Sequence, residues 1–192
     1  RANTTAGFSI VTASPGGAAT IGHGLNAVPE FILAKSRTNT YNWAIYHSAT
    51  GRDKVLIMNS TSAGASVTGF WGSSDPTSSV FGVGSGSSTN NTGDMVYYCF
   101  APVASFSAMG SYQGNGSSNG TFVELSFRPA LIIIKRYDAS ENYYMIDTAR
   151  DTYNLAGKSL QANEANAEPS IGGSYSATLD ILSNGFKLRD SG

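Results

Sequence analysis

Short apolar runs separated by polar turns make up nearly the whole chain. Few stretches place apolar residues at helical spacing without a glycine, a proline or a Ser/Thr cluster between them. β-Branched and aromatic residues instead recur in short runs that are bounded by turn residues. This pattern predicts an all-β protein made of antiparallel strands.

An internal repeat is the strongest signal in this pattern. The segment 29–50 aligns without a gap to the segment that lies 100 residues later. The number of identical residues exceeds the roughly one or two that two unrelated segments of average composition would share by chance. The identical positions are Pro29, Ile32, Lys35, Asn42 and Ala49. A shift of 105 matches Asp75, Ser78 and Phe81 to Asp180, Ser183 and Phe186. The chain therefore reads as two related units.

Each unit is predicted to contain a central hairpin. In the first, the apolar run 31–34 and the partner run 43–47 flank a polar loop at 38–40, and in the second the runs 131–134 and 143–148 flank 138–141. Both first strands follow a proline, which suits a strand's first position because it has no N–H to donate. Since 31–34 and 131–134 are apolar without alternation, we expect these strands to be covered on both faces.

Further strands are predicted on either side of the hairpins. The segment 8–12 alternates and should bury Phe8 and Ile10, and 95–100 should send Val96, Tyr98 and Phe100 to one side. The remaining predicted strands are 55–58, 79–83, 106–109 and 121–125. Long polar loops lie at 60–77, 85–91 and 161–176, and variable function usually resides in such loops.

We therefore expect two antiparallel β-sandwich units in tandem, at residues 1–103 and 104–192. The counterpart of the strand 95–100 would fall at about residues 195–206, beyond Gly192, so unit two should lack its final strand. The open edge would be completed by further residues or by a neighbouring chain. The alternative is one larger lectin-like or jelly-roll sandwich made from both repeats.

Composition narrows the class of partners. Only 13% of residues are charged, the net charge is −1, and glycine occurs 22 times. Because no lysine or arginine cluster is present, we expect no nucleic-acid partner and no membrane insertion. A surface solvated by hydroxyls and amides favours a virion or extracellular location.

The residues that could carry chemistry are sparse. Cys99 is the only cysteine and is expected to be a buried strand thiol, while His23 is expected to anchor a turn. With His47 as the only other histidine, no usual Cys/His zinc site can form, and we expect no metal or cofactor. The candidate carboxylates for hydrolysis are Glu124, Asp147, Asp151, Glu168 and Asp180, and nothing in their spacing forces a pair together. The protein is not expected to be an enzyme.

Aromatic residues near amides and hydroxyls offer a way to hold glycans, because a flat ring can stack on a sugar face. Trp43 and Tyr143 occupy equivalent places in the two units, which favours a shared core role for both. The candidate ligand-binding residues are Trp71, Phe70, Tyr41 and Tyr153.

Several motifs resemble a β-rich family of tail fibre and related virion structural proteins in tailed bacteriophages, especially phages of marine bacteria. The motifs are Gly7–Val11, Ile21–Leu25, Asp75–Phe81, Tyr98–Ala101, Gly110–Gly116, Phe127–Pro129 and Ser183–Leu188. The segment 13–17 departs from the family, whose members tend to show an aromatic followed by Gly-Asn-Gly or Gly-Thr-Gly. The resemblance implies a virion component and carries over no binding site.

Together these expectations describe a non-enzymatic bacteriophage virion protein, in a tail fibre or surface appendage involved in host attachment. Its partners would be copies of itself or other virion proteins, with a host-surface glycan as ligand. The alternatives are a lectin-like glycan-binding module outside a phage, a capsid decoration protein and, last, a tail-associated glycan hydrolase.

Overall fold

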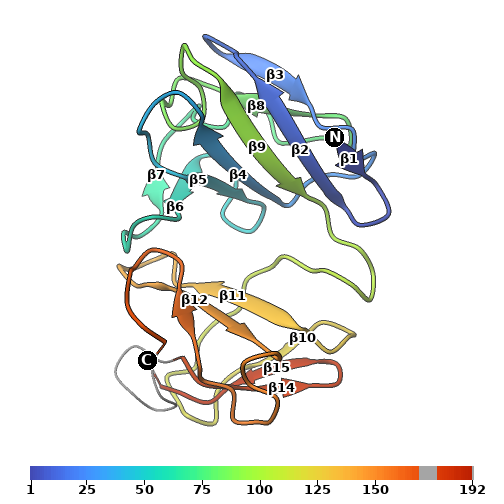
Figure 1. The fold of residues 1–192 in the computed structure, drawn as a ribbon, viewed down its shortest axis with the longest axis vertical. Helices are drawn as coiled ribbons and strands as arrows, with labels where there is room; N and C mark the ends of the chain where they lie inside the picture. Colours follow the sequence, from blue (N-terminus) through green and yellow to red (C-terminus); the bar gives the residue numbers. More distant parts are fainter. Residues whose placement is uncertain (169–176, 192) are drawn as a thin grey trace. The chain divides into compact units, whose positions relative to one another are not determined.

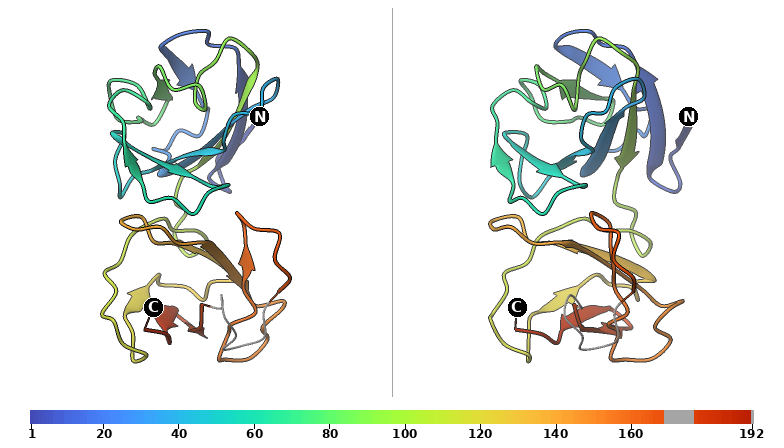
Figure 2. Two further views of the ribbon diagram at one scale, coloured as in Figure 1. Left: turned by 90° about the vertical axis from the view of Figure 1, so that its left-hand side faces the viewer. Right: turned by 60° about the vertical axis from the view of Figure 1, so that its left-hand side comes forward.

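The protein is all-β. The computed structural model describes residues 1–168 and 177–191, and within them no helix is present (Figure 1). Of the loop predicted at 161–176, residues 169–176 lie outside the described residues. Antiparallel strands joined by turns and loops form each part of the chain, as Figure 2 shows from two further directions.

The chain divides into two compact units. Unit 1 comprises Arg1–Gly110 with Tyr137–Ala139, and unit 2 comprises Ser111–Arg136 with Ser140–Gly192. The compact division thus falls after Gly110, and the repeat boundary between residues 103 and 104 stays a prediction about the sequence.

Unit 1 contains a seven-stranded sheet and a two-stranded sheet. The larger sheet has the order β1 (Ala2–Asn3), β2 (Phe8–Ala13), β9 (Met95–Phe100), β4 (Phe31–Ser36), β5 (Ala44–His47), β6 (Lys54–Ile57) and β7 (Ala65–Ser66). The smaller sheet pairs β3 (Ala19–Gly22) with β8 (Val80–Val83). As Figure 1 shows, β9 lies between β2 and β4 although it follows both in the chain.

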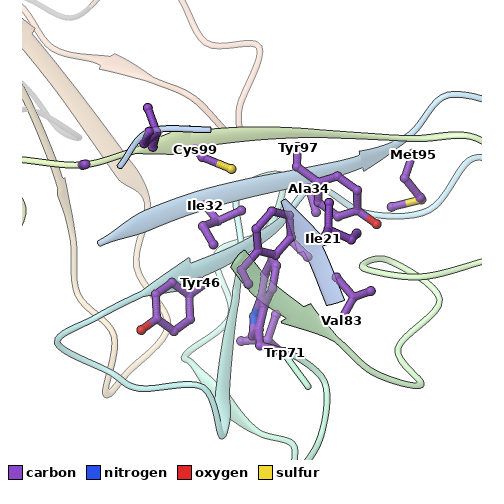
Figure 3. Packing of buried hydrophobic residues seen from close by; sticks show 14 residues of the cluster. Ile21, Ile32, Ala34, Tyr46, Trp71, Val83, Met95, Tyr97 and Cys99 are labelled. Carbon is purple, nitrogen blue, oxygen red and sulfur yellow. The ribbon is translucent and has the colours of Figure 1, made fainter. Parts of the chain in front are cut away.

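One apolar core joins the two sheets of unit 1 (Figure 3). Tyr97 of β9 and Phe81 of β8 meet edge to face with ring centroids 5.1 Å apart. The Tyr97 hydroxyl donates to the Thr89 carbonyl at 2.8 Å, which satisfies its polar end inside the core. Contact between side chains of both sheets makes unit 1 a sandwich-like, two-layer structure.

The strand faces correct two details of the prediction. β4 alternates between buried and half-buried positions, so its outer face is not fully covered as a continuous apolar run suggested. In β2 the core face carries Ser9, whose hydroxyl donates to the His23 carbonyl at 2.6 Å, while Ile10 is exposed. The alternation in β9 is confirmed, with Met95, Tyr97 and Cys99 buried and the residues between them half-buried.

The described residues of unit 2 form two three-stranded sheets. One has the order β11 (Leu131–Lys135), β12 (Tyr143–Asp147) and β13 (Leu160–Gln161), and the other has the order β10 (Phe122–Glu124), β15 (Gly185–Leu188) and β14 (Leu179–Leu182). Both sheets contribute to a smaller core of six buried apolar residues: Ile132, Ile146, Ala156, Leu179, Ile181 and Phe186. The segment 106–109 forms no strand, contrary to prediction, and an isolated bridge joins Val103 to Ser107.

The pairing registers of the two units correspond. The matching pairs are Ile21↔Phe81 with Val123↔Phe186, Phe31↔His47 with Leu131↔Asp147, and Ile45↔Leu56 with Met145↔Leu160. Both predicted hairpins are present as β4–β5 and β11–β12. The strands β3, β4, β5, β6 and β8 therefore match β10, β11, β12, β13 and β15.

The polar residues that survive in the repeat hold the hairpin loops. The Lys35 ammonium donates to the Tyr41 carbonyl, and the Lys135 ammonium donates to the Glu141 carbonyl at 2.7 Å. The two ammonium groups also lie 5.8 and 5.5 Å from the ring centroids of Trp43 and Tyr143, respectively. The lysine identity in the repeat thus has a structural cause.

An asparagine clamp fixes the end of each hairpin. The Trp43 N–H donates to Asn59 Oδ1 at 3.0 Å, and Asn59 Nδ2 donates to Asn42 Oδ1 at 3.0 Å. In unit 2, the Tyr143 N–H donates to Asn163 Oδ1 at 2.8 Å, and Asn163 Nδ2 donates to Asn142 Oδ1 at 2.7 Å. The clamp explains why the asparagine is retained at positions 42 and 142.

Candidate functional site

The four predicted ligand-binding residues are divided between the two units. Phe70 and Trp71 contact each other, with ring centroids 6.3 Å apart, in a loop of unit 1. Tyr41 lies in the β4–β5 loop and is 40% exposed. Tyr153 belongs to unit 2, follows β12 and is 84% exposed. Tyr41 and Tyr153 are accessible, and they lie in different units.

Trp71 is a core residue in this structure. It is 2% exposed and packs edge to face against Tyr46 with ring centroids 6.0 Å apart (Figure 3). Its indole N–H is buried and has no hydrogen-bond partner among residues 1–168 and 177–191. Because its ring faces are covered by protein, Trp71 cannot stack on a sugar in this conformation.

The loop that carries Phe70 is held tightly against the chain that follows β8. The Gly84 N–H and the Thr89 hydroxyl both donate to the Phe70 carbonyl at 3.0 Å. A Cβ on Gly84 would lie 1.4 Å from the Gly69 carbonyl oxygen, so this close approach requires a glycine. The two loops predicted at 60–77 and 85–91 thus brace each other and leave Phe70 half-buried.

The outer face of the seven-stranded sheet carries two groups of aromatic side chains. Together we call them the outer aromatic face. One row crosses β2, β9, β4 and β5, with neighbouring ring centroids 4.7 to 6.3 Å apart: Phe8, Phe100, Phe31 and His47. Nearby, Trp43 stacks on Tyr98 with centroids 6.4 Å apart and planes inclined by 26°. All these side chains are half-buried, so part of each ring is accessible to solvent.

Charge on this face is limited. Lys35 places its ammonium beside the Trp43 ring, in the arrangement of a cation–π contact. Burial lowers the pKa of His47, so its imidazole is neutral at neutral pH, and Nδ1 accepts a hydrogen bond from the Ala49 N–H at 3.1 Å. In unit 2 Asp147 makes the same kind of contact with the Ala149 N–H at 3.0 Å. The ring of His47 therefore serves the turn after β5.

Amide side chains border the outer aromatic face at the β4–β5 loop. Asn39, Asn42 and Asn59 are exposed, and Asn39 Nδ2 donates to Asn91 Oδ1 at 3.4 Å. Such amides carry both donors and acceptors, which match the hydroxyl groups of a sugar. Partly exposed rings beside amides and one ammonium form a surface that suits a neutral polyhydroxylated ligand.

Sequence reasoning placed Trp43 in the core and did not connect it with Tyr98. Alternation in 95–100 assigned Val96, Tyr98 and Phe100 to one side, which is the signal that could have located the face. The sequence pattern does not identify the neighbours of β9, because pairing between β9 and β4 joins residues about 65 positions apart in the chain.

Three of the candidate carboxylates, Asp147, Asp151 and Asp180, are engaged in local structure. Arg150 Nε donates to Asp147 Oδ2 at 2.7 Å, and the pKa of Asp147 is lowered first by the Arg150 N–H and then by the Arg150 side chain. Arg189 Nε donates to Asp180 Oδ2 at 2.6 Å. The buried Asp151 accepts the N–H groups of Gly157 and Lys158 at 2.9 and 2.7 Å. These contacts fix turns and strand ends of unit 2.

Cys99 and His23 are buried. Desolvation raises the pKa of the Cys99 thiol to about 12, which keeps it protonated and weakly nucleophilic. His23 Nδ1 accepts the Leu25 N–H at 3.2 Å, and Nε2 lies 3.1 Å from the Thr77 carbonyl, as a turn-anchoring residue would.

Two further properties concern only residues 1–168 and 177–191. No group of three or more His, Cys, Asp and Glu side chains there could hold a metal ion. No helix in this part of the chain has the length and apolar character needed to cross a membrane.

Comparison with known proteins gives one match. The family model described as domain of unknown function DUF7483 matches residues 1–192. The chain belongs to the DUF7483 family. No curated protein and no solved structure matches the chain. The DUF7483 description assigns no activity and no ligand.

Proposed function

We propose that this chain is a non-enzymatic structural and attachment protein of a bacteriophage virion, located in a tail fibre or surface appendage. An all-β architecture with few charged residues and many Gly, Ser, Thr and Asn residues supports the proposal, because such a chain solvates its surface with hydroxyl and amide groups rather than with charge. The family resemblance of its motifs supports it as well.

The outer aromatic face is the proposed attachment surface, and a surface glycan of the host bacterium is its proposed ligand. The observation that carries this step is the stack of Trp43 on Tyr98, together with the exposed Tyr41, whose carbonyl accepts a hydrogen bond from the Lys35 ammonium that lies beside the Trp43 ring. The accessible parts of these rings can cover the apolar side of a sugar, while Asn39 and Asn42 can exchange hydrogen bonds with its hydroxyl groups.

A matched pair of exposed tyrosines tests this assignment. The intact chain, Tyr41→Ala and Tyr153→Ala would be applied to an array of purified bacterial surface polysaccharides. Both side chains are exposed, so neither substitution should alter the fold. Binding by the intact chain and by Tyr153→Ala, with loss in Tyr41→Ala, is the expected result.

Other results would contradict the assignment. Loss in Tyr153→Ala alone would place the site in unit 2, and absence of binding to every polysaccharide would remove the attachment role. Cleavage of a polysaccharide, abolished by Glu124→Gln or Asp147→Asn, would instead establish a tail-associated hydrolase.

A further inference from the structure

β9 completes unit 1 by filling the place between β2 and β4. On the core side it contributes Met95, Tyr97 and Cys99, none of which has solvent exposure. On the outer side, Phe100 stands opposite Phe31 and Tyr98 stands opposite Leu33. One strand thus closes both the core and the outer face beside β4.

β11 of unit 2 matches β4 in register and lacks this neighbour. Among residues 1–168 and 177–191, β11 pairs with β12 alone and forms the edge of its sheet. Leu131 is 54% exposed and Ile133 is 48% exposed, whereas the matching Phe31 and Leu33 are half-buried beside β9. The exposed apolar residues therefore lie where β9 would cover them.

Beside Leu131 and Ile133, the edge of β11 that is open among the described residues carries backbone hydrogen-bonding groups as well as apolar side chains. The Thr148 N–H donates to the Ala130 carbonyl at 3.0 Å, so the backbone groups of Ala130 face β12. Because successive residues of a strand alternate in direction, the backbone groups of Leu131 and Ile133 face away from β12. An edge with unpaired backbone groups beside apolar side chains is a template for strand addition.

We propose that this edge binds an antiparallel strand from a neighbouring polypeptide, with apolar side chains toward the core and aromatic side chains outward. The register of β9 on β4, transferred to β11, places an outer aromatic opposite Leu131 and another opposite Ile133. A small apolar residue stands opposite Ile132, as Cys99 stands opposite Ile32.

The partner strand must differ from β9 at one inner position. Tyr97 stands opposite Ala34, and the matching residue of β11 is the larger Ile134, which packs on the unit 2 core. Less space remains there, so a valine-sized residue fits better than a tyrosine.

A second copy of β11 fits this edge less well. In antiparallel pairing centred on Ile133, Lys135 of one copy would stand opposite Leu131 of the other. No aromatic side chain would then cover the exposed leucine. On the core side, the second copy would offer only isoleucines in the positions that the core-facing residues of β9 occupy beside β4. The aromatic partner strand is therefore the occupant that the register favours.

Hydrogen exchange measured by mass spectrometry tests the proposal on the full chain. The probe is a synthetic peptide of residues 94–101 carrying Tyr97→Val. The control peptide has the same composition, but residue 97 is exchanged with residue 98, and residue 99 is exchanged with residue 100. These exchanges move the outward side chains to the inner face and the inward side chains to the outer face. We expect the probe peptide, and not the control peptide, to slow hydrogen exchange in the segment 131–135. The rate should fall by about tenfold or more, which corresponds to an increase of about 1.4 kcal/mol in the free energy of local opening.

Two edge variants keep the test decisive. Ile133→Pro removes an N–H that faces the open edge, which an edge strand tolerates, and should abolish the protection. If Ile133→Pro does not fold, Ile133→Lys should weaken the protection by replacing the outer apolar contact. Protection of the segment 131–135 by both peptides, or by neither, would overturn the proposal. Protection that appears when the concentration of the chain is raised without any peptide would also overturn it, because a second copy of the chain would then occupy the edge.

Discussion

The ammonium nitrogen of Lys35 lies 5.8 Å from the ring centroid of Trp43. Lys135 lies 5.5 Å from Tyr143 in unit 2, and both lysines also donate to a carbonyl of the following hairpin loop. A cation, an aromatic ring and an asparagine clamp are thus repeated as one structural device. The Lys35 side chain consequently supports the hairpin as well as the outer aromatic face.

Loss of the asparagine clamp should destabilise the unit that contains it. Asn59→Ala and Asn163→Ala each remove two hydrogen bonds at the end of a hairpin, and each should lower the free energy of unfolding by about 1–2 kcal/mol. Both tryptophans, Trp43 and Trp71, belong to unit 1, so tryptophan fluorescence reports on that unit. In urea titrations, Asn59→Ala should lower the fluorescence midpoint more than Asn163→Ala does. Equal shifts would mean that the two units unfold together.

The buried Trp71 should tolerate phenylalanine far better than alanine. Trp71→Ala removes a fully buried ring and should cost about 3–5 kcal/mol. Trp71→Phe retains a ring, and the indole N–H has no partner in the described part of the chain, so a loss of about 1–2 kcal/mol is expected. Equilibrium unfolding in urea measures both. Similar losses for the two variants would show that Trp71 does not pack as described.

The Cys99 thiol should make stability fall at alkaline pH. Its pKa is raised from 9.0 to about 12 by burial, so between these values the unfolded chain loses the proton while the folded chain keeps it. The stabilising effect is complete below about pH 9 and disappears as the pH rises towards 12. The free energy of unfolding, measured from pH 8 upward, should fall less steeply in Cys99→Ala. An unchanged slope would contradict burial of the thiol.

Acid should weaken the turn after β12. Hydrogen bonds from Arg150 lower the pKa of Asp147. The ionised Asp147 therefore stabilises the turn above the ordinary pKa of 3.8, and this stabilisation is lost as the pH falls below that value. Hydrogen exchange in the segment 143–150 should therefore accelerate in acid beyond its intrinsic pH dependence. Asp147→Ala removes the acceptor oxygens and should show fast exchange at every pH, whereas retained protection in this variant would assign the turn's stability to other contacts.

Local patterns predicted the hairpins because each one depends on nearby residues. The proline, the apolar run and the polar loop of 29–47 contain the information for β4 and β5, and its echo predicted β11 and β12. The all-β class followed from the same patterns. Periodicity alone could not place β9 between β2 and β4, since that pairing depends on long-range packing.

The candidate site was harder to predict than the fold. Trp71 stands in a Gly-rich segment that resembles an exposed loop, yet close backbone approaches at Gly84 allow that loop to fold over the core. Conversely, the repeat suggested a core role for Trp43, and its half-buried position on the outer sheet face depends on Tyr98 of a distant strand. Ring exposure is a property of tertiary packing, which composition and spacing do not contain.

Fluorescence of Trp43 tests the central claim most directly. In the Trp71→Phe background, Trp43 is the only tryptophan, and it lies within the outer aromatic face. Titration with the bacterial surface polysaccharide that binds on the array should change its emission to a saturable extent, and Tyr41→Ala should weaken this response. Binding of the polysaccharide to the chain without any change in Trp43 emission would contradict the claim that the outer aromatic face is the attachment surface.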